Sequence, residues 1–347
     1  MSAVPQLSLP VVPETLDTLA RPLRDVRISL LDQCNFRCPY CMPFGVPAAS
    51  MVRRANWLTV DEIERFVRVA AEHGVRKVRL TGGEPLLRDD LERIVERIAS
   101  LGVIADLALT TNGALLTARA RSLRDAGLDR LTVSLDALHP QVFREMSGAR
   151  GQVADVLAGI DAAVAAGFAT LKINTVVERG RNEDQVLLLA EHFRGSGHVL
   201  RFIELMDAGS CNAWRREQVV PSSELRERIG QRWPLHSIAG VQRGDVATRW
   251  AYDDGAGEIG FVSSITQPFC GDCTRLRLGA DGRLYTCLFA RSGTDVRASL
   301  AAGEELVLGR ILGNLWRGRR DRYSEMRSGV ADPRVTSSKV EMYRVGG

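Results

Sequence analysis

The chain has 347 residues, 45% of them hydrophobic and 32 of them glycine, so it is long enough to bury the core of one large domain and a smaller one. This composition excludes a largely disordered protein, and a formal net charge of +4 by itself indicates neither nucleic acid nor any other partner. No apolar run approaches the roughly 18 residues of a membrane span and no signal peptide is visible, so we expect a soluble, cytoplasmic protein.

The predicted elements begin after a proline-punctuated N-terminal arm, residues 1–24. From 25 to 234, apolar segments alternate with amphipathic ones, which is typical of a parallel sheet with crossover helices. The apolar segments that we predict as strands are 26–31, 77–83, 104–113, 130–137, 170–177 and 198–207. The amphipathic segments that we predict as helices are 59–74, 89–102, 116–126, 152–167 and 183–193.

Helix-start signals support this reading. Thr59 followed by Glu62 is a capping-box pair, and Ile63 and Phe66 begin an apolar face behind it. About six right-handed strand-helix units give either an incomplete barrel or an open doubly wound sheet. Both folds place ligands at the carboxyl ends of the strands.

Residues 235–347 have a different pattern of short strands and turns, at 257–265 and 275–289, followed by helical segments and a terminal Gly-Gly. We therefore predict a second region there. In the strand RLRL, alternation puts Arg275 and Arg277 on one face, where both can reach one polyanion.

The cysteines form two incomplete ligand sets. Cys34, Cys38 and Cys41 have the spacing C-x3-C-x2-C, and the second triplet lies near the other end of the chain. That second set consists of Cys270, Cys273 and Cys287. Three thiolates suit a metal cluster with one open corner better than a structural zinc site, which normally takes four ligands. Cys211 falls outside both triplets, and we expect a plain thiol there.

The turn Gly82-Gly83-Glu84-Pro85 follows a predicted strand. Its glycines allow backbone to approach a ligand closely, and the Glu84 carboxylate suits a protonated amine. A tight strand-to-helix turn is the simpler interpretation of this stretch taken alone.

These motifs carry a family resemblance. CNFRCPYC (34–41) together with GGEP (82–85) resembles the radical S-adenosylmethionine superfamily. The stretch 269–289, RFIELMD (201–207) and SKVEMYRVGG (338–347) further resemble the GTP 3′,8-cyclase family of molybdenum cofactor biosynthesis. The resemblance implies an incomplete (β/α)6 TIM-like barrel over 25–234 and a C-terminal auxiliary-cluster region over 235–347.

The resemblance also implies cofactors and site residues. Cys34, Cys38 and Cys41 would hold one 4Fe-4S cluster, and the second triplet would hold another. The residues that would contact S-adenosylmethionine are Tyr40, Gly83, Ser134 and Met206. Those that would bind GTP are Arg27, Arg79, Thr110, Lys172, Arg275, Leu276 and Arg277. The resemblance assigns catalytic roles to Arg27, Arg275, Arg277, Gly346 and Gly347.

The implied reaction moves a hydrogen from ribose C3′ of GTP and closes a bond to C8 of guanine, giving 3′,8-cyclo-7,8-dihydro-GTP. The expected partners are an electron donor such as flavodoxin or ferredoxin and a downstream cyclic pyranopterin monophosphate synthase; the sequence leaves open whether the chain forms a homodimer. A second reading is a radical enzyme that modifies a peptide or matures a protein. A zinc-stabilised nucleic-acid module is a third, which too few ligands and the lack of a basic, aromatic stripe disfavour.

Overall fold

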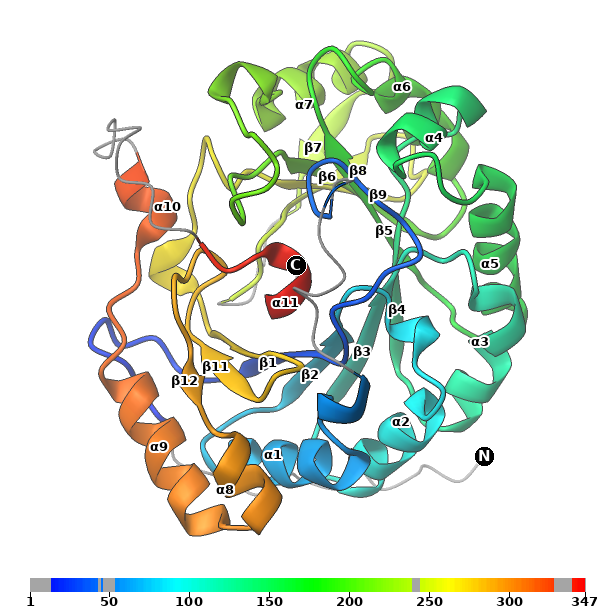
Figure 1. Ribbon diagram of the computed structural model, residues 1–347. Helices are drawn as coiled ribbons and strands as arrows, with labels where there is room; N and C mark the ends of the chain where they lie inside the picture. The colour runs from blue at the N-terminus through cyan, green and yellow to red at the C-terminus, as the bar shows by residue number, and fades with distance from the viewer. Residues whose placement is uncertain (1–13, 43–44, 46–53, 239–243, 328–338, 347) are drawn as a thin grey trace, which may run out of the picture.

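The computed structural model describes residues 14–42, 45, 54–238, 244–327 and 339–346. Their strands form one twelve-stranded sheet in the order β12-β11-β10-β1-β2-β3-β4-β5-β6-β9-β8-β7. Figure 1 looks into the curled sheet, with most of the helices around its outer side and α11 near the centre. The two ends of the strand order do not pair with each other among the described residues, so the barrel is incomplete.

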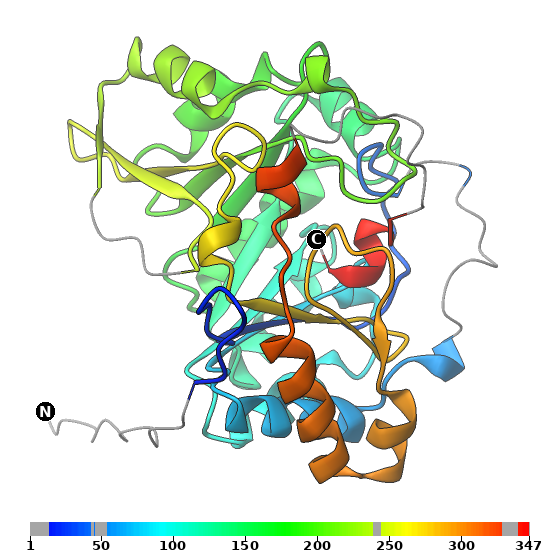
Figure 2. The ribbon, with the colours of Figure 1, turned by 90° about the vertical axis from the view of Figure 1, so that its left-hand side faces the viewer.

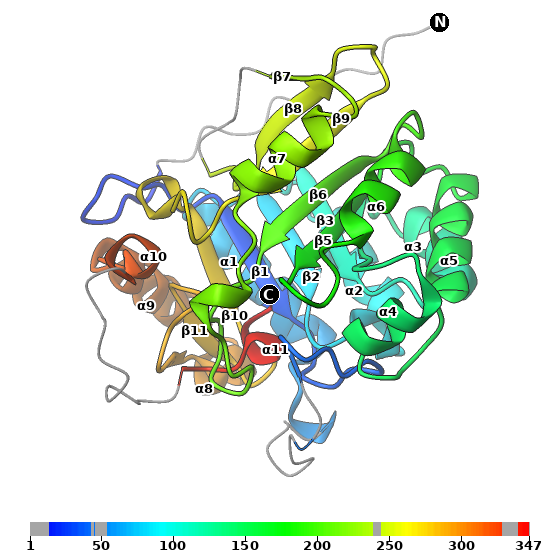
Figure 3. The same cartoon turned by 90° about the horizontal axis from the view of Figure 1, so that it is seen from above.

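The central part of the sheet is parallel from β10 through β9. Its strands are β1 (Asp25–Ser29), β2 (Lys77–Thr81), β3 (Asp106–Thr111), β4 (Arg130–Ser134), β5 (Lys172–Val177), β6 (Val199–Glu204), β9 (Glu258–Val262) and β10 (Arg275–Leu278). Antiparallel strands extend both edges (Figure 3), namely β7 (Leu235–Ser237) and β8 (Thr248–Tyr252) at one edge, and β11 (Arg283–Tyr285) and β12 (Thr294–Asp295) at the other.

Most of the helices pack on the convex side. They are α1 (Val60–Glu72), α2 (Leu91–Ser100), α3 (Leu116–Asp125), α4 (Pro140–Met146), α5 (Val153–Ala165), α6 (Gln185–Phe193), α7 (Ser222–Gly230), α8 (Arg297–Ala302) and α9 (Glu305–Arg317). Two short helices, α10 (Tyr323–Met326) and α11 (Met342–Val345), lie near the carboxyl ends of the strands. None of the helices built from the described residues is long and apolar enough to cross a bilayer.

The local signals read from the sequence explain these elements. Thr59 caps α1 and forms the predicted capping box with Glu62, which is confirmed. Ile63 and Phe66 on that helix are fully buried. In β1, Val26 and Ile28 are also fully buried, while the alternate residue Arg27 faces the interior of the barrel. The core therefore lies between sheet and helices, and polar side chains are left for the barrel interior.

The incomplete α/β barrel is confirmed, but its sheet is wider than the six predicted strands. The region after 234 adds β9 beside β6 and β10 beside β1, both parallel. The pairing of β10 with β1 joins residues 250 positions apart and that of β9 with β6 joins residues 59 positions apart, and sequence periodicity carries no information about partners at either distance. The domain boundaries at 24 and 234 stay predictions.

The described part of the N-terminal arm docks on the body. Arg21 is fully buried and forms an ion pair with Asp17 at 2.6 Å. It also donates to the carbonyl oxygens of Cys270 (2.7 Å) and Asp321 (2.8 Å). The indole of Trp316 on α9 donates to the Arg21 carbonyl at 3.0 Å, and Figure 2 shows α9 beside α1. This part of the arm thus supports the second cysteine triplet.

Glu204, at the carboxyl end of β6, joins the barrel to the segment after β9. Its Oε1 accepts from Ser222 N (2.8 Å) and the Thr266 hydroxyl (2.6 Å), and its Oε2 accepts from Ile265 N (2.8 Å) and Thr266 N (2.9 Å). Because the carboxylate is fully buried, these four donors depend on it for their hydrogen bonds.

We expect Glu204→Gln to lower the free energy of unfolding by about 3 kcal/mol, because the new amide NH2 group faces donors in either orientation. Urea unfolding followed by circular dichroism measures this. Glu224→Gln is the matched control, since Glu224 forms an exposed pair with Arg179 and its loss should cost less than about 1 kcal/mol. Equal losses in both variants would contradict the role of Glu204.

Candidate active site

A cavity of about 470 Å³ lies inside the barrel. Its wall combines strand residues with the second cysteine triplet, which the sequence alone could only place in separate regions. The predicted site residues that line it are Arg27, Arg79, Thr110, Lys172, Met206, Cys270, Cys273, Arg275, Arg277 and Cys287. Leu276, the remaining residue predicted to bind GTP, is fully buried and does not line the cavity.

Strand register explains why the arginines meet. Arg27 on β1 lies opposite Arg79 on β2 and opposite Arg277 on β10. Residues at the same level of a parallel sheet point to the same face, so the three guanidinium groups enter the cavity side by side. Arg275 enters two positions earlier on β10, opposite Asp25.

This concentration of positive charge calls for an anion. Burial, followed by the nearby Arg277, Arg275 and Arg79, holds the pKa of Arg27 well below its usual range. The Nε atoms of Arg27 and Arg275 are buried without a hydrogen-bond partner. An oxyanion with several charges would pair with these donors and relieve the repulsion.

Two further cations complete this wall. Burial is the largest cause that lowers the pKa of Lys172 to about 7, and Arg201 is the second. Arg201 on β6 lines the cavity and donates to Asn174 Oδ1 at 2.6 Å. Sequence reasoning missed Arg201, although its alternation with the buried Phe202 placed it on the interior face.

Arg79 is held by two hydroxyls. Its Nη1 donates to the Oγ1 atoms of Thr110 and Thr132, each at 3.1 Å. Thr110 therefore orients a cation at the wall, besides lining the cavity itself.

The second triplet surrounds the same cavity. Cys270 and Cys273 lie at the two ends of a short 3-10 turn, and Cys287 follows β11. Burial alone would raise the pKa of the Cys273 thiol, but Arg275 and Arg319 outweigh it and lower this pKa to about 6. Arg319 donates to Cys273 Sγ at 3.2 Å and to its carbonyl oxygen at 2.7 Å. A thiolate at Cys273 suits a metal ligand.

The first triplet lies in the loop after β1. Cys41 N and Met42 N both donate to the Cys38 carbonyl, at 3.0 and 2.9 Å, which closes a turn. Burial is the largest cause that raises the pKa of Cys34, to about 12, and that of Cys38, where Asp136 and the other two thiols add to it. These thiols are close together and resist deprotonation in the unliganded protein. A bound metal centre would lower their pKa values and stabilise the thiolates, so the loop is suited to binding such a centre.

No three His, Cys, Asp or Glu side chains in the described part of the chain are arranged around a single metal ion. A mononuclear zinc site needs such an arrangement. The thiolates of an iron-sulfur cluster bind different iron atoms, so a cluster does not need such an arrangement.

The Gly82-Gly83 turn braces the first cysteine loop. Gly83 N donates to Leu31 O at 2.7 Å, and a Cβ atom at Gly83 would lie 2.0 Å from Gln33 O. Only glycine allows this approach of the two backbones. The expected contact of Glu84 with an amine is not supported, because the carboxylate is 1% exposed and accepts from the Thr111 hydroxyl and from Asn112 N, both at 2.7 Å.

The residues predicted to contact S-adenosylmethionine lie on several elements. The Tyr40 hydroxyl, inside the first cysteine motif, donates to Asp136 Oδ2 at 2.6 Å, two residues after Ser134 at the end of β4. Met206 follows β6 and faces the cavity. Their roles stay predictions.

The C-terminal segment also reaches this site. Arg277 Nη1 donates to the carbonyl oxygen of Val345 at 3.0 Å and to that of Gly346. Gly346 has a φ of +68°, and a Cβ atom there would lie 2.3 Å from Thr81 Cγ2. Glycine is therefore required at 346 for both conformation and space. The prediction for Gly347 lies outside the described residues.

Comparison with known proteins identifies relatives over most of the chain. Residues 28–193 match the radical SAM superfamily, and residues 198–325 match Molybdenum Cofactor Synthesis C. A GTP 3′,8-cyclase of Xanthomonas campestris is 55% identical, covering 95% of this chain and 97% of the relative. GTP 3′,8-cyclases of Acidothermus cellulolyticus and Aquifex aeolicus are 50% and 42% identical, covering 90% and 96% of this chain and 88% and 99% of the relatives.

Solved structures are similar in fold at low sequence identity. Streptococcus suis SuiB bound to S-adenosylmethionine superposes with a TM-score of 0.61 at 14% identity, covering 89% of this chain and 69% of that one. Native anSMEcpe with bound AdoMet gives a TM-score of 0.55 at 14% identity, covering 92% and 93%. At this identity the similarity concerns the fold alone.

The crowded arginines predict binding of inorganic triphosphate. At 100 times its dissociation constant, triphosphate should raise the free energy of unfolding by about 2.7 kcal/mol. We expect Arg27→Met to weaken this binding at least tenfold, because charge-assisted hydrogen bonds contribute about 1.5–3 kcal/mol. Calorimetric titration checks this, with exposed Arg121→Met as control. Unchanged affinity in Arg27→Met would contradict the anion site.

Proposed function

Because the chain belongs to the GTP 3′,8-cyclase family, we infer that it cyclises GTP to 3′,8-cyclo-7,8-dihydro-GTP, the opening step of molybdenum cofactor biosynthesis. The family expected from the motifs is confirmed, as is the radical SAM fold. One observation carries the proposal: a single cavity joins Arg27, Arg79 and Arg277 to the second cysteine triplet. Such a cavity suits a ligand with a polyanionic end and an end that a metal can bind.

Cys34, Cys38 and Cys41 would hold the first 4Fe-4S cluster and leave one iron open. When bound, this cluster supplies the electron that cleaves S-adenosylmethionine to methionine and a deoxyadenosyl radical. Tyr40, oriented by Asp136, and the Gly83 backbone would flank this cofactor, together with Ser134 and Met206. The protein contributes orientation and exclusion of water.

Cys270, Cys273 and Cys287 would hold a second 4Fe-4S cluster against the purine end of GTP. The triphosphate, with about four negative charges, would be bound by the guanidinium groups and by Lys172. Arg79, fixed by Thr110 and Thr132, presents a preorganised donor. Arg275 and Arg277 lie between the two ends of the substrate, close to the second triplet.

This placement would hold ribose C3′ toward the first cysteine loop and C8 of guanine within reach of C3′. Removal of the C3′ hydrogen, bond formation to C8 and reduction then give the product. Arg277 binds the Val345 and Gly346 carbonyls, so the C-terminal segment would close the cavity beside the reacting sugar.

The other readings are less well supported. A peptide-modifying or maturase function has no counterpart in the 42–55% identical relatives compared above, whose printed name is GTP 3′,8-cyclase. A zinc-stabilised nucleic-acid module disagrees with the barrel fold. The flavodoxin or ferredoxin donor, the downstream cyclic pyranopterin monophosphate synthase, a homodimer and a cytoplasmic location stay predictions.

Cysteine substitutions should separate the two clusters. We expect Cys34→Ala to abolish cleavage of S-adenosylmethionine, whereas Cys270→Ala should retain some cleavage and lose GTP turnover. Anaerobic assays of deoxyadenosine and cyclised product measure this, with iron analysis expected to give about eight irons per wild-type chain and about four in each variant. Cys211→Ala is the control for iron content, which should stay at about eight irons per chain. Cyclisation that survives Cys270→Ala would contradict the second cluster.

Lys172 should make GTP binding depend on pH. Its pKa of about 7 in the free protein must rise when a triphosphate binds, because the anion favours the ammonium form. Above pH 7, binding therefore takes up a proton, and affinity falls by up to tenfold per pH unit until the pKa of the bound state is passed. Calorimetry in buffers of different ionisation enthalpy measures this. Lys172→Arg should remove the proton uptake, and an unchanged uptake would contradict the assignment.

A further inference from the structure

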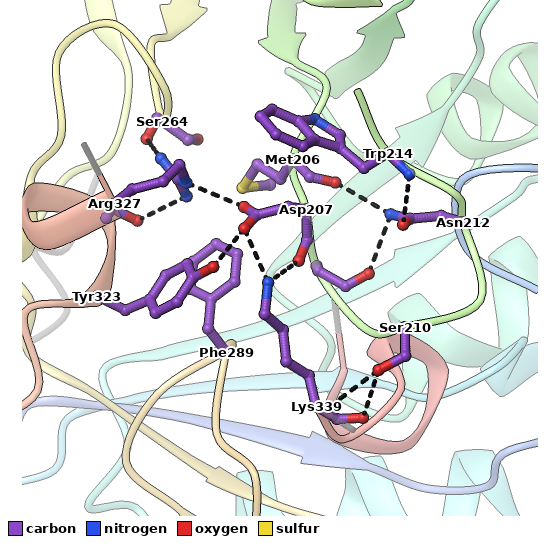
Figure 4. A network of polar contacts seen from close by, with 12 residues as sticks. Met206, Asp207, Ser210, Asn212, Trp214, Ser264, Phe289, Tyr323, Arg327 and Lys339 are labelled. Carbon is purple, nitrogen blue, oxygen red and sulfur yellow. Dashed lines mark hydrogen bonds and ion pairs between the residues drawn. The ribbon is translucent and has the colours of Figure 1, made fainter. Parts of the chain in front are cut away.

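We propose that Asp207 and Lys339 form a positioning pair that ties the C-terminal segment 339–346 to the loop after β6, so that Gly346 is held beside Arg277. The inference rests on the proposed function, in which this segment closes the cavity. Neither residue is assigned a role by the sequence motifs or by the comparisons. Figure 4 shows Asp207 at the centre of the contacts that join the two parts.

Asp207 accepts hydrogen bonds from three side chains, two at α10 and its C-terminal end and one at position 339, all more than 100 residues away in the sequence. Lys339 Nζ donates to its Oδ2 at 2.8 Å and to its carbonyl oxygen at 2.7 Å. Tyr323 OH donates to Oδ2 at 2.5 Å, and Arg327 Nε donates to Oδ1 at 3.0 Å. Asp207 is 9% exposed, so little water competes for these contacts.

Neighbouring contacts fix the direction of the segment. Lys339 N donates to the Ser210 hydroxyl at 2.9 Å, and Ser210 N donates to Glu341 Oε1 at 3.1 Å. The Cys211 thiol donates to Glu341 Oε2 at 2.9 Å. The segment is therefore joined to three residues of the loop, Asp207, Ser210 and Cys211, and Lys339 supplies the cation.

The same loop carries Met206, the predicted contact of S-adenosylmethionine. Asn212 Nδ2 donates to the carbonyl oxygen of Met206 at 3.2 Å (Figure 4) and to that of Ala208 at 3.1 Å. The Trp214 indole donates to Leu205 O at 2.9 Å. These bonds make the loop a fixed support. Loss of Lys339 should therefore release the tail and leave the cofactor position in place.

At its far end the segment is buried in the barrel. Tyr343 and Val345 are 2% and 0% exposed, and the Ser29 hydroxyl donates to Tyr343 O at 3.4 Å. Arg277 binds the last two described carbonyls. Eight residues, 339–346, thus link the contact with Asp207 to the contacts with Arg277.

The choice of lysine supports a specific role. Only three of the 46 basic residues in the chain are lysine, and the other two, Lys77 and Lys172, line the cavity. The single Nζ atom of Lys339 donates to two oxygen atoms of Asp207, the carbonyl oxygen and Oδ2. The same atom lies over the rings of Tyr323 (4.6 Å) and Phe289 (5.5 Å). The planar guanidinium group of an arginine spreads its donors over several nitrogen atoms and cannot make both hydrogen bonds from one atom. Phe289 follows Cys287, so the pair also contacts the second-triplet loop.

The test compares Lys339→Met with Arg310→Met, which removes an exposed cation on α9. Amide hydrogen exchange is measured in the reconstituted proteins, and S-adenosylmethionine binding, deoxyadenosine and cyclised product are measured in parallel. In Lys339→Met we expect exchange of residues 340–346 to accelerate at least tenfold, with exchange of β1–β5 unchanged. Product formation should fall at least tenfold, deoxyadenosine less than threefold and cofactor affinity less than twofold. Arg310→Met should match the wild type.

Unchanged tail exchange in Lys339→Met would overturn the inference, as would product formation within twofold of the wild type. If Lys339→Met does not fold, Lys339→Arg is used, for which we expect tail exchange accelerated two- to fivefold; wild-type exchange in that variant would equally overturn the inference. A wild-type protein that makes no cyclised product would overturn the proposed function instead, because the exchange experiment needs no substrate.

Discussion

The parallel pairing of β10 with β1 is the contact on which the rest of the site depends. It places Arg277 opposite Arg27 and Arg275 opposite Asp25. Because Cys273 lies only two residues before Arg275, the same pairing places Cys273 and its triplet at the barrel interior. A shift of this register by one residue would turn both arginines toward the core and empty the cavity wall of its charge.

This arrangement brings several positively charged side chains close together inside the barrel. Buried arginines on neighbouring strands repel one another, and only hydroxyls, backbone carbonyls and a few carboxylates oppose the repulsion. The barrel tolerates this because Arg79 is held by two threonines and Arg277 by the C-terminal carbonyls. The unbound protein therefore contains electrostatic repulsion among these arginines. Binding of a polyanionic substrate would relieve this repulsion, and the relief would contribute to the binding free energy.

Residues outside the proposed catalytic and ligand-binding set hold the site residues in position. The N-terminal arm holds the Cys270 carbonyl through Arg21, and Arg319 holds Cys273. Glu204 ties the end of β6 to the segment after β9, while its near neighbour Asp207 receives the C-terminal segment. The carboxyl end of β6 thus joins the barrel to both later parts of the site.

Two kinds of information were needed to describe this protein. The sequence alone determined the local chemistry: the spacing of Cys34, Cys38 and Cys41, the capping box of α1, the alternating strands and the family, because these depend on neighbouring residues. Arg201 shows that even an interior position readable from alternation was overlooked. Only the tertiary structure decided that β9 and β10 widen the sheet, that the Glu84 carboxylate is bound by Thr111 and Asn112 and that Lys339 meets Asp207. Pairing between distant segments depends on packing of the whole chain, which local pattern does not encode.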